Sequence, residues 1–287
     1  MPGFGIPIQF PPRRVVSLVP SMTESLFDLG LGGCVVGVTD YCIHPAHALP
    51  GLPKMGGPKD FRVEEIVRLR PDLVIANQEE NAEILVRRLL EASIPVWITF
   101  PRSVNDALKD LMDLSGLFRN DMAARTVRLL EQSVEYCRMA AVETRRRYFC
   151  PIWQQEARDC AWWMTFNSDT YSSDLLAVLG GENIFAGRAR KYPLAADIVD
   201  ALEEPAGSRD TRYPRVSLTE IASARPEYLI FPDEPCLFTA QDQQRLCEQL
   251  AKRMGDTPRI VSIDGSLINW PGTRISKALE DLNGVFT

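Results

Sequence analysis

A fourteen-residue phrase occurs twice in this chain of 287 residues, and its repetition limits the folds that the chain can adopt. The first copy, VEEIVRLRPDLVIA, occupies residues 63–76, and the second, LTEIASARPEYLIF, occupies residues 218–231. Each copy reads as a short amphipathic helix that a proline ends, followed directly by a buried strand. The copies start 155 residues apart, whereas solenoid repeats recur every ~20–50 residues. We therefore expect two similar α/β halves instead of an array of short repeats.

The length of the chain and one long helical pattern predict how these halves are joined. A chain of 287 residues is near the size at which a single hydrophobic core stops growing, so two lobes are expected. Residues 120–148 contain no glycine or proline, and apolar residues recur there at helical spacing. A helix of about 28 residues would span roughly 42 Å. We predict an N-terminal α/β lobe at 1–118, a connecting helix at 119–148 and a C-terminal α/β lobe at 149–287.

The order of the elements predicts the type of sheet. Strand-like and helix-like segments alternate through the first half, which implies mainly parallel strands, and the second half mirrors that order. The expected fold class is therefore α/β, with two Rossmann-like lobes of mainly parallel sheets joined by one long α-helix.

Composition excludes several classes of partner. A net charge of -6 and a pI near 5.2 argue against nucleic acid, which is bound mainly by clustered Lys and Arg. No stretch of about 20 apolar residues predicts a transmembrane helix. The first 21 residues lack the basic start and apolar region of a signal peptide. We expect a cytoplasmic location for the chain as written, or a periplasmic one if a leader has been removed.

Cysteines and histidines offer little for metal chemistry. The seven cysteines are scattered without a CxxC pair, which indicates reduced thiols. The two histidines, His44 and His47, lie near Cys42, and an imidazole could ligate the metal of a bound macrocycle. Pro45 interrupts their spacing, so we expect packing or polar contacts there and predict no metal site. The sequence also lacks G-x-S-x-G, H-E-x-x-H and G-x-x-x-x-G-K-[ST], and we predict no enzymatic activity.

Several segments together resemble a class of substrate-binding proteins in which one long helix joins two α/β lobes. Proteins of this class serve ABC importers of cobalamin and ferric siderophores. The resemblance implies a ligand in the cleft between the lobes, either a corrinoid such as cobalamin or another metal chelate such as a ferric siderophore or haem. It implies no covalent cofactor, a monomeric protein and an ABC permease as partner. The matching segments are RRVVSLVPSMTESLFDLGL, VVGVTDYCIHP, VEEIVRLRPDLVIANQEEN, LLAVLGGENIF and YPRVSLTEIASARPEYLIF.

The resemblance also implies particular ligand contacts. The aromatic residue that follows VGV corresponds to Tyr41 or His44, and the aromatic residue before the second copy of the phrase corresponds to Tyr213. An acidic residue of the last loop corresponds to Asp264, and the WWM stretch at 162–164 matches another contact region. These matches make all of them candidate ligand residues, Met164 included.

Tryptophans suit such a ligand, because a corrin or haem presents a large, flat, apolar face and a buried ring removes on the order of 150–250 Å² from water. Trp270 has no firm counterpart in the class but lies in the same C-terminal loop as Asp264. We expect Trp163 and Trp270 to lie in loops and to contact the ligand; the alternative is that they are ordinary core residues.

One glutamate in each lobe docks the permease in this class of proteins. Glu64, seven residues before the proline of the first phrase, matches that position. The second phrase has Thr219 there, and Glu220 follows one residue later. Glu64 and Glu220 are thus candidate docking residues, although glutamates also favour the first turn of any helix. The alternative function is a cytosolic enzyme or chaperone for a tetrapyrrole or metal chelate, or a sensor that is not coupled to transport.

Overall fold

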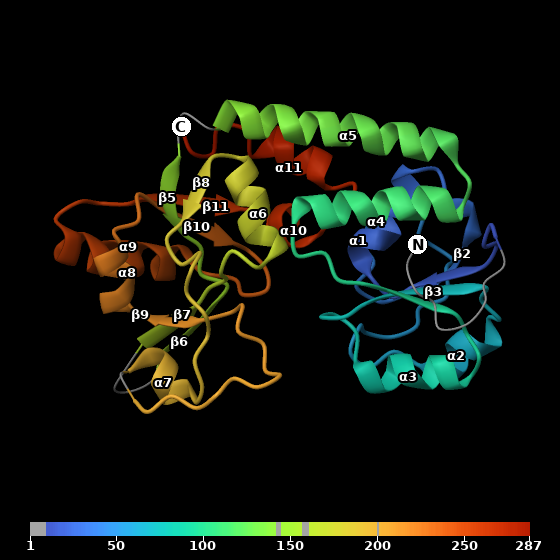
Figure 1. Cartoon of the computed structure of the whole chain (residues 1–287), viewed down its shortest axis with the longest axis horizontal. Coiled ribbons are helices and arrows are strands. Elements are labelled where there is room, and N and C mark those ends of the chain that lie inside the picture. The colour runs from blue at the N-terminus through green and yellow to red at the C-terminus, as the bar shows by residue number, and fades with distance from the viewer. Residues whose placement is uncertain (1–9, 142–144, 157–160, 200) are drawn as a thin grey trace. The chain divides into compact units, whose positions relative to one another are not determined.

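The computed structural model describes residues 10–141, 145–156, 161–199 and 201–287, which form two compact units. The first unit comprises the chain up to Ser133 together with Trp270–Lys277, and the second comprises Val134–Asn269 together with Ala278–Thr287. Both contain helices and parallel strands (Figure 1), so the expected α/β class is confirmed. The last part of the chain contributes to both units.

A four-stranded parallel sheet in the order β2-β1-β3-β4 organises the first unit. Figure 1 shows α2 and α3 on one face of this sheet and α1 and α4 on the other. The strands are β1 (Val15–Ser17), β2 (Val35–Val38), β3 (Leu73–Asn77) and β4 (Val96–Thr99). The helices are α1 (Pro20–Asp28), the 3-10 helix η1 (Gly32–Cys34), α2 (Val63–Arg68), α3 (Glu83–Glu91) and α4 (Val104–Leu117).

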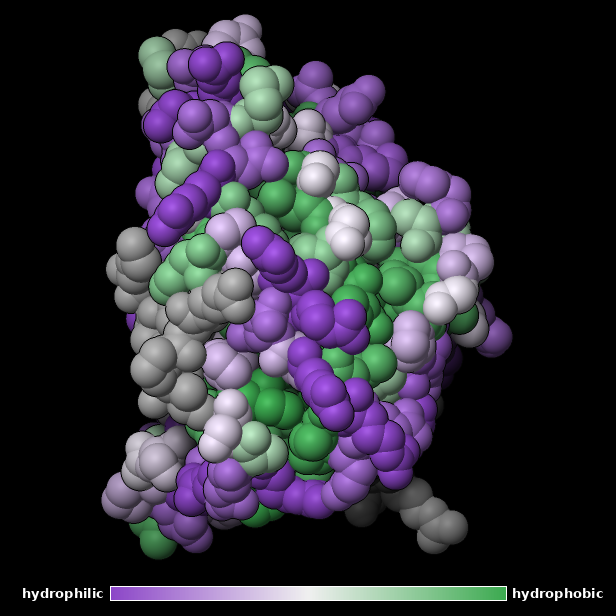
Figure 2. Space-filling model, turned by 90° about the vertical axis from the view of Figure 1, so that its right-hand side faces the viewer, coloured by the Kyte–Doolittle hydropathy of each residue, from purple (hydrophilic) through white to green (hydrophobic). Residues whose placement is uncertain are grey.

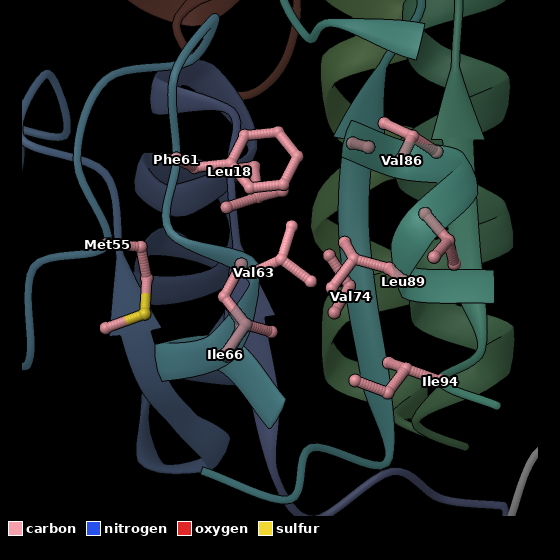
Figure 3. Close-up of a cluster of buried hydrophobic side chains, with 12 residues drawn as sticks. Leu18, Met55, Phe61, Val63, Ile66, Val74, Val86, Leu89 and Ile94 are labelled. Atoms are coloured by element: carbon pink, nitrogen blue, oxygen red, sulfur yellow. The ribbon is translucent and has the colours of Figure 1, made fainter. Parts of the chain in front are cut away.

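The core of this unit follows the alternation of side chains along its strands. Val16 of β1 and Val74 of β3 face α2 and α3, where they contact one cluster of buried apolar residues (Figure 3). Each large aliphatic side chain that is fully buried contributes about 1.5–3 kcal/mol relative to exposure. The helical members of this cluster are Val63, Ile66, Val86 and Leu89.

The strand β2 forms one edge of the sheet. Figure 2 views the molecule from the right-hand side of Figure 1, where β2 lies, and hydrophobic residues gather in the middle of that face between hydrophilic rims. Val36 of β2 is partly buried and packs against the core cluster. The edge strand is thus held by apolar contacts on its inner side.

A half-buried carboxyl on α4, that of Asp110, should make the stability of the fold depend on pH. Burial raises the pKa of Asp110 to about 7; the charge of Lys109 opposes this rise, and those of Asp113 and Asp106 add to it. Because the folded-state pKa lies above the unfolded value, the stability linked to this proton is present below about pH 4 and lost as the pH rises through about 7. We expect Asp110→Asn to remove this loss.

At pH 8 the Asp110→Asn variant should exceed the wild type in free energy of unfolding by about 1–2 kcal/mol, which is less than the full shift because solvent reaches the group. Urea unfolding of both proteins at pH 4.5 and pH 8 measures this. A difference that stays constant between the two pH values would contradict it.

Two sheets organise the second unit. The first is parallel in the order β11-β10-β5-β8, and the second is antiparallel in the order β6-β7-β9. The strands are β5 (Arg146–Phe149), β6 (Trp153–Glu156), β7 (Ala161–Met164), β8 (Gly181–Asn183), β9 (Arg215–Ser217), β10 (Tyr228–Pro232) and β11 (Arg259–Ile263). The helices are α6 (Tyr171–Val178), α7 (Leu194–Ile198), α8 (Leu218–Ala224), α9 (Ala240–Met254) and α10 (Ser266–Asn269). The last helix, α11 (Ile275–Asp281), starts in the first unit and ends in the second.

The repeated phrase forms the predicted helix, proline and strand in both units. The first copy is α2 followed by β3, and the second is α8 followed by β10. The residue before each proline adopts a left-handed conformation, with φ of 46° at Arg70 and 45° at Arg225. Both helices therefore end in the same sharp turn, which an ordinary helical arginine would not adopt without cost.

The acidic residue after each proline completes the same hydrogen-bonding pattern. Asp72 donates its backbone N–H to the carbonyl of Arg14, and Glu227 donates to the carbonyl of Arg147, both at 2.8 Å. Each carboxylate also accepts a hydrogen bond from the backbone N–H of the same arginine, at 2.9 Å from Arg14 N and 2.9 Å from Arg147 N. The two units thus repeat a local structure as well as a sequence phrase.

The connecting helix is shorter than predicted. It is α5 (Asp121–Ala140), of 20 residues, and residues 146–149 form β5 instead of a last helical turn; residues 142–144 lie outside the described part. Tyr148 and Phe149 are fully buried and pair with Tyr228 and Leu229 of β10. This pairing across the chain outweighs the local helical pattern. In the described part of the chain, no helix is both long and apolar enough to cross a bilayer.

Candidate functional site

Two of the expected ligand residues lie on the loop that follows β2 in the first unit. Tyr41 is 64% exposed and His44 is half-buried. Open α/β sheets bind ligands beyond the carboxyl ends of their parallel strands, which is where this loop begins. The first unit therefore presents an aromatic ring and an imidazole at the edge where a ligand is expected.

The loop is anchored from within by a cysteine. The Cys42 sulfur lies 3.1 Å from the hydroxyl oxygens of both Thr23 and Thr39, and burial raises the pKa of its thiol. Lys54 donates its Nζ proton to the carbonyl oxygens of Thr39 and Cys42, at 3.2 and 3.0 Å. Cys42 is thus a protonated structural group that fixes the backbone between Tyr41 and His44.

Trp270, from the distant C-terminal segment, completes the group in the first unit. It is half-buried in a loop, as predicted, and its ring centroid lies 5.8 Å from that of His44 at an interplanar angle of 65°. The guanidinium carbon of Arg274 lies 4.8 Å from the Trp270 centroid. Such edge-to-face and cation–π contacts orient the indole.

The segment that carries Trp270 is fastened to α1. Arg274 donates from Nε and Nη2 to the two carboxylate oxygens of Glu24, each at 2.7 Å, and these side chains are only 4% and 14% exposed. The Thr273 hydroxyl donates to Asp28 at 2.6 Å. Sequence reasoning did not pair Glu24 with Arg274, because 250 residues separate them and no local pattern links them.

A glycine allows the close approach of this segment. Gly272 has a φ of 148°, and a Cβ there would lie 2.4 Å from the Ser25 hydroxyl. The backbone N–H of Thr273 donates to the same hydroxyl at 3.1 Å. The stretch WPGTR therefore carries both the ring and the residues that hold it in place.

In the second unit, Trp163 differs from expectation. It lies on β7 instead of in a loop, opposite Val216 of β9, and is 6% exposed. Its side chain belongs to a core cluster with Phe149 and Phe231. The expected loop location was wrong, because β6 and β9 pair with this stretch on both sides. Met164, which ends β7, is half-buried opposite Arg215 and Trp153.

The other two expected contacts of the second unit lie at strand ends. Tyr213 is half-buried just before β9, and the guanidinium carbon of Arg212 lies 5.3 Å from its ring centroid. Asp264 follows β11 and is exposed, but its Oδ1 accepts from the backbone and hydroxyl of Ser266, at 2.9 and 2.5 Å. Asp264 therefore also stabilises the first turn of α10.

The two candidate docking glutamates have different surroundings. Glu64 is exposed on α2 and pairs with Arg88 of α3; a hydrogen bond from its own backbone N–H and the charge of Arg88 lower its pKa. Glu220 on α8 accepts from Arg188 Nε at 2.8 Å, and Arg188 also lies 3.0 Å from the buried Asp197. Glu220 thus belongs to an internal ionic network, whereas Glu64 forms an isolated surface pair. Docking by either glutamate stays a prediction.

No group of three or more His, Cys, Asp or Glu side chains among the described residues could hold a metal ion. Six cysteines are free, and Cys160 lies outside the described part.

Comparison with known proteins identifies what the chain is similar to. Residues 15–257 match the model of a family described as periplasmic binding protein. A vitamin B12-binding protein of Vibrio parahaemolyticus is 28% identical over 189 residues, which cover 64% of this chain and 65% of that relative's length.

Two solved structures share the fold. The periplasmic vitamin B12-binding protein of Vibrio cholerae has a TM-score of 0.71 at 20% identity over 96% of both chains. A periplasmic haem-binding protein of Roseiflexus, in apo form, has a TM-score of 0.69 at 22% identity and covers 96% of this chain and 97% of its own. At such identities the likeness establishes the fold.

Proposed function

We propose that this chain, which belongs to the periplasmic binding protein family, holds a corrinoid or another metal chelate and delivers it to an ABC-type importer. The family match over most of the chain carries the proposal. The similar proteins named above bind vitamin B12 or haem, and both of these ligands are flat metal macrocycles. Binding proteins of this kind hold a solute without converting it, so no catalytic residue is assigned.

The geometry of the first unit supports this class of ligand. Exposed Tyr41 and the oriented pair of His44 and Trp270 offer aromatic surface and an imidazole ring to a flat chelate. We propose Tyr41, His44 and Trp270 as contacts from this unit, and Met164, Tyr213 and Asp264 as contacts from the second. Delivery to an importer favours a location outside the cytoplasmic membrane over the cytoplasmic one, and we propose that the protein acts as a monomer.

Absorption titrations test the proposed function. Purified protein is titrated separately with cyanocobalamin, dicyanocobinamide, haemin and ferrichrome. We expect a saturable spectral change at one ligand per chain with at least one of the four, weakened about five- to hundredfold in the Trp270→Ala variant because a buried ring contributes on the order of 1–3 kcal/mol.

Absence of saturable binding by all four probes at micromolar concentrations would contradict the proposal. Consumption or chemical alteration of a bound probe would support the alternative of an enzyme. The matched control is Trp153→Ala, because Trp153 is 47% exposed on β6 and is not proposed to contact the ligand.

A further inference from the structure

A buried guanidinium nitrogen in the second unit lacks a hydrogen-bond partner. The Nε of Arg190 is enclosed, and nothing within the described residues accepts its proton. An unsatisfied buried donor is costly, and more so when it is charged. Arg190 as a whole is half-buried, so the rest of its side chain is within reach of a molecule from solvent. The described residues therefore leave this guanidinium without an acceptor for its Nε proton.

The side chain of Arg190 is held against a fixed aromatic ring. Its guanidinium carbon lies 5.0 Å from the ring centroid of Tyr192, and that of Arg209 lies 4.0 Å from the same centroid. The Tyr192 hydroxyl donates to the carbonyl of Asp210 at 2.7 Å, which fixes the ring. The N–H groups of a guanidinium lie in its own plane. A guanidinium that stacks on a ring can therefore still donate hydrogen bonds from its edge to a ligand.

The nearby carboxylates are engaged by other arginines. Asp210 accepts from the backbone N and Nε of Arg212 with Oδ1, at 2.9 and 3.0 Å, and from Nη2 with Oδ2 at 2.5 Å. Burial alone would raise the pKa of Asp210, but Arg212 and, to a lesser extent, Arg190 lower it overall. Glu204 lies 3.6 Å from Arg209. Asp210 and Glu204 are thus each already paired with an arginine other than Arg190.

Arg190 also lies close in the structure to a proposed ligand contact. Its backbone N–H donates to the carbonyl of Thr211 at 2.8 Å, two residues before Tyr213. The Asn167 side chain donates to the same carbonyl at 3.4 Å. Backbone hydrogen bonds therefore couple the position of Arg190 to the strand end that carries Tyr213.

We propose that Arg190 is a subsite for an anionic oxygen of the ligand, a carboxylate or a phosphate, beside Tyr213. The inference rests on the proposed function and extends it to the charge of the ligand. The reachable edge of a guanidinium can donate two parallel N–H···O bonds to such a group.

Paired probes with and without anionic groups test the subsite. Haemin carries two carboxylates and its dimethyl ester carries none; cobalamin carries a phosphate that cobinamide lacks. For whichever pair binds, we expect Arg190→Met to lower the affinity for the probe with the anionic group by about tenfold or more. The affinity for the other probe of the pair should stay nearly unchanged. Arg190→Lys should show a smaller loss, because it keeps the charge but not the fork.

Arg209→Met is the matched control. Arg209 stacks on the same Tyr192 ring, but its Nε already donates to the carbonyl of Ala206 at 3.0 Å. Equal loss of affinity in the two methionine variants would mean that only the stack matters and would overturn the proposal. A wild-type protein that binds both members of a pair equally well would also overturn it. If Arg190→Met does not fold, the Arg190→Lys variant and the wild-type affinities for the two probes of a pair still test the proposal.

A measurement without a metal chelate separates this inference from the proposed function. Titration of the wild type with inorganic phosphate and with citrate is followed through the Nε–Hε resonances of the arginines, and Arg190→Lys identifies the signal. We expect a saturable displacement of the Arg190 signal by at least one of the two anions. An unmoved signal with both would overturn the subsite, whichever chelate the protein binds.

Discussion

Replacing Trp163 by alanine should lower the free energy of unfolding by about 3–5 kcal/mol and leave ligand affinity nearly unchanged. The indole is enclosed on β7 within the same cluster as Phe149 and Phe231, so its removal leaves a cavity that strands on both sides prevent from closing. Chemical denaturation and absorption titration of the same variant measure the two quantities.

Trp270→Ala provides the comparison. Its ring is half-buried, so we expect a loss of only about 1 kcal/mol of stability together with the loss of affinity described above. A stable Trp163→Ala protein with weakened binding would show instead that Trp163 contacts the ligand, as first expected. An unstable Trp270→Ala protein with unchanged affinity would remove Trp270 from the site.

Glu24→Gln should produce the other large effect. The substitution removes the Glu24 carboxylate from its buried ion pair with Arg274, and breaking such a pair costs about 3 kcal/mol or more. Because Arg274 also lies over the Trp270 ring, the indole should lose its fixed orientation and ligand affinity should fall. Denaturant unfolding and titration with the bound chelate measure both.

Asp28→Asn is the matched control, because Asp28 bonds the same segment through the Thr273 hydroxyl. Proton NMR of the folded protein adds a measurement that does not depend on global stability. The chain has only two histidines, so His44 can be assigned with a His47→Gln variant, and its ring protons sense the edge-to-face indole. Unchanged His44 resonances in Glu24→Gln would refute the orienting role of this ion pair.

Local patterns in the sequence were sufficient for the elements and the fold class. The repeated phrase predicted two helix–proline–strand units, and α2–β3 and α8–β10 confirm them. Proline termination and runs of apolar residues act over a few residues, so they can be read without tertiary information. The segments that resemble the binding-protein class likewise predicted the family, which the match over residues 15–257 confirms.

Contacts between distant residues decided the rest. The absence of glycine and proline from 120–148 was compatible with a helix throughout, but burial of Tyr148 and Phe149 beside β10 made the last part a strand. The surroundings of Trp163 in the sequence resembled a loop, and pairing with both β6 and β9 placed it in the core.

The candidate site shows the same division most clearly. The sequence by itself determined which aromatic and polar residues were available, because residue type and neighbouring motifs are local information. Only the tertiary structure brought Trp270 to His44, set Arg274 on Glu24 across 250 positions, and left the Nε of Arg190 enclosed without an acceptor in the described part of the chain. The physical reason is that ring contacts, ion pairs and buried donors depend on distances in space, which no local pattern of residues specifies.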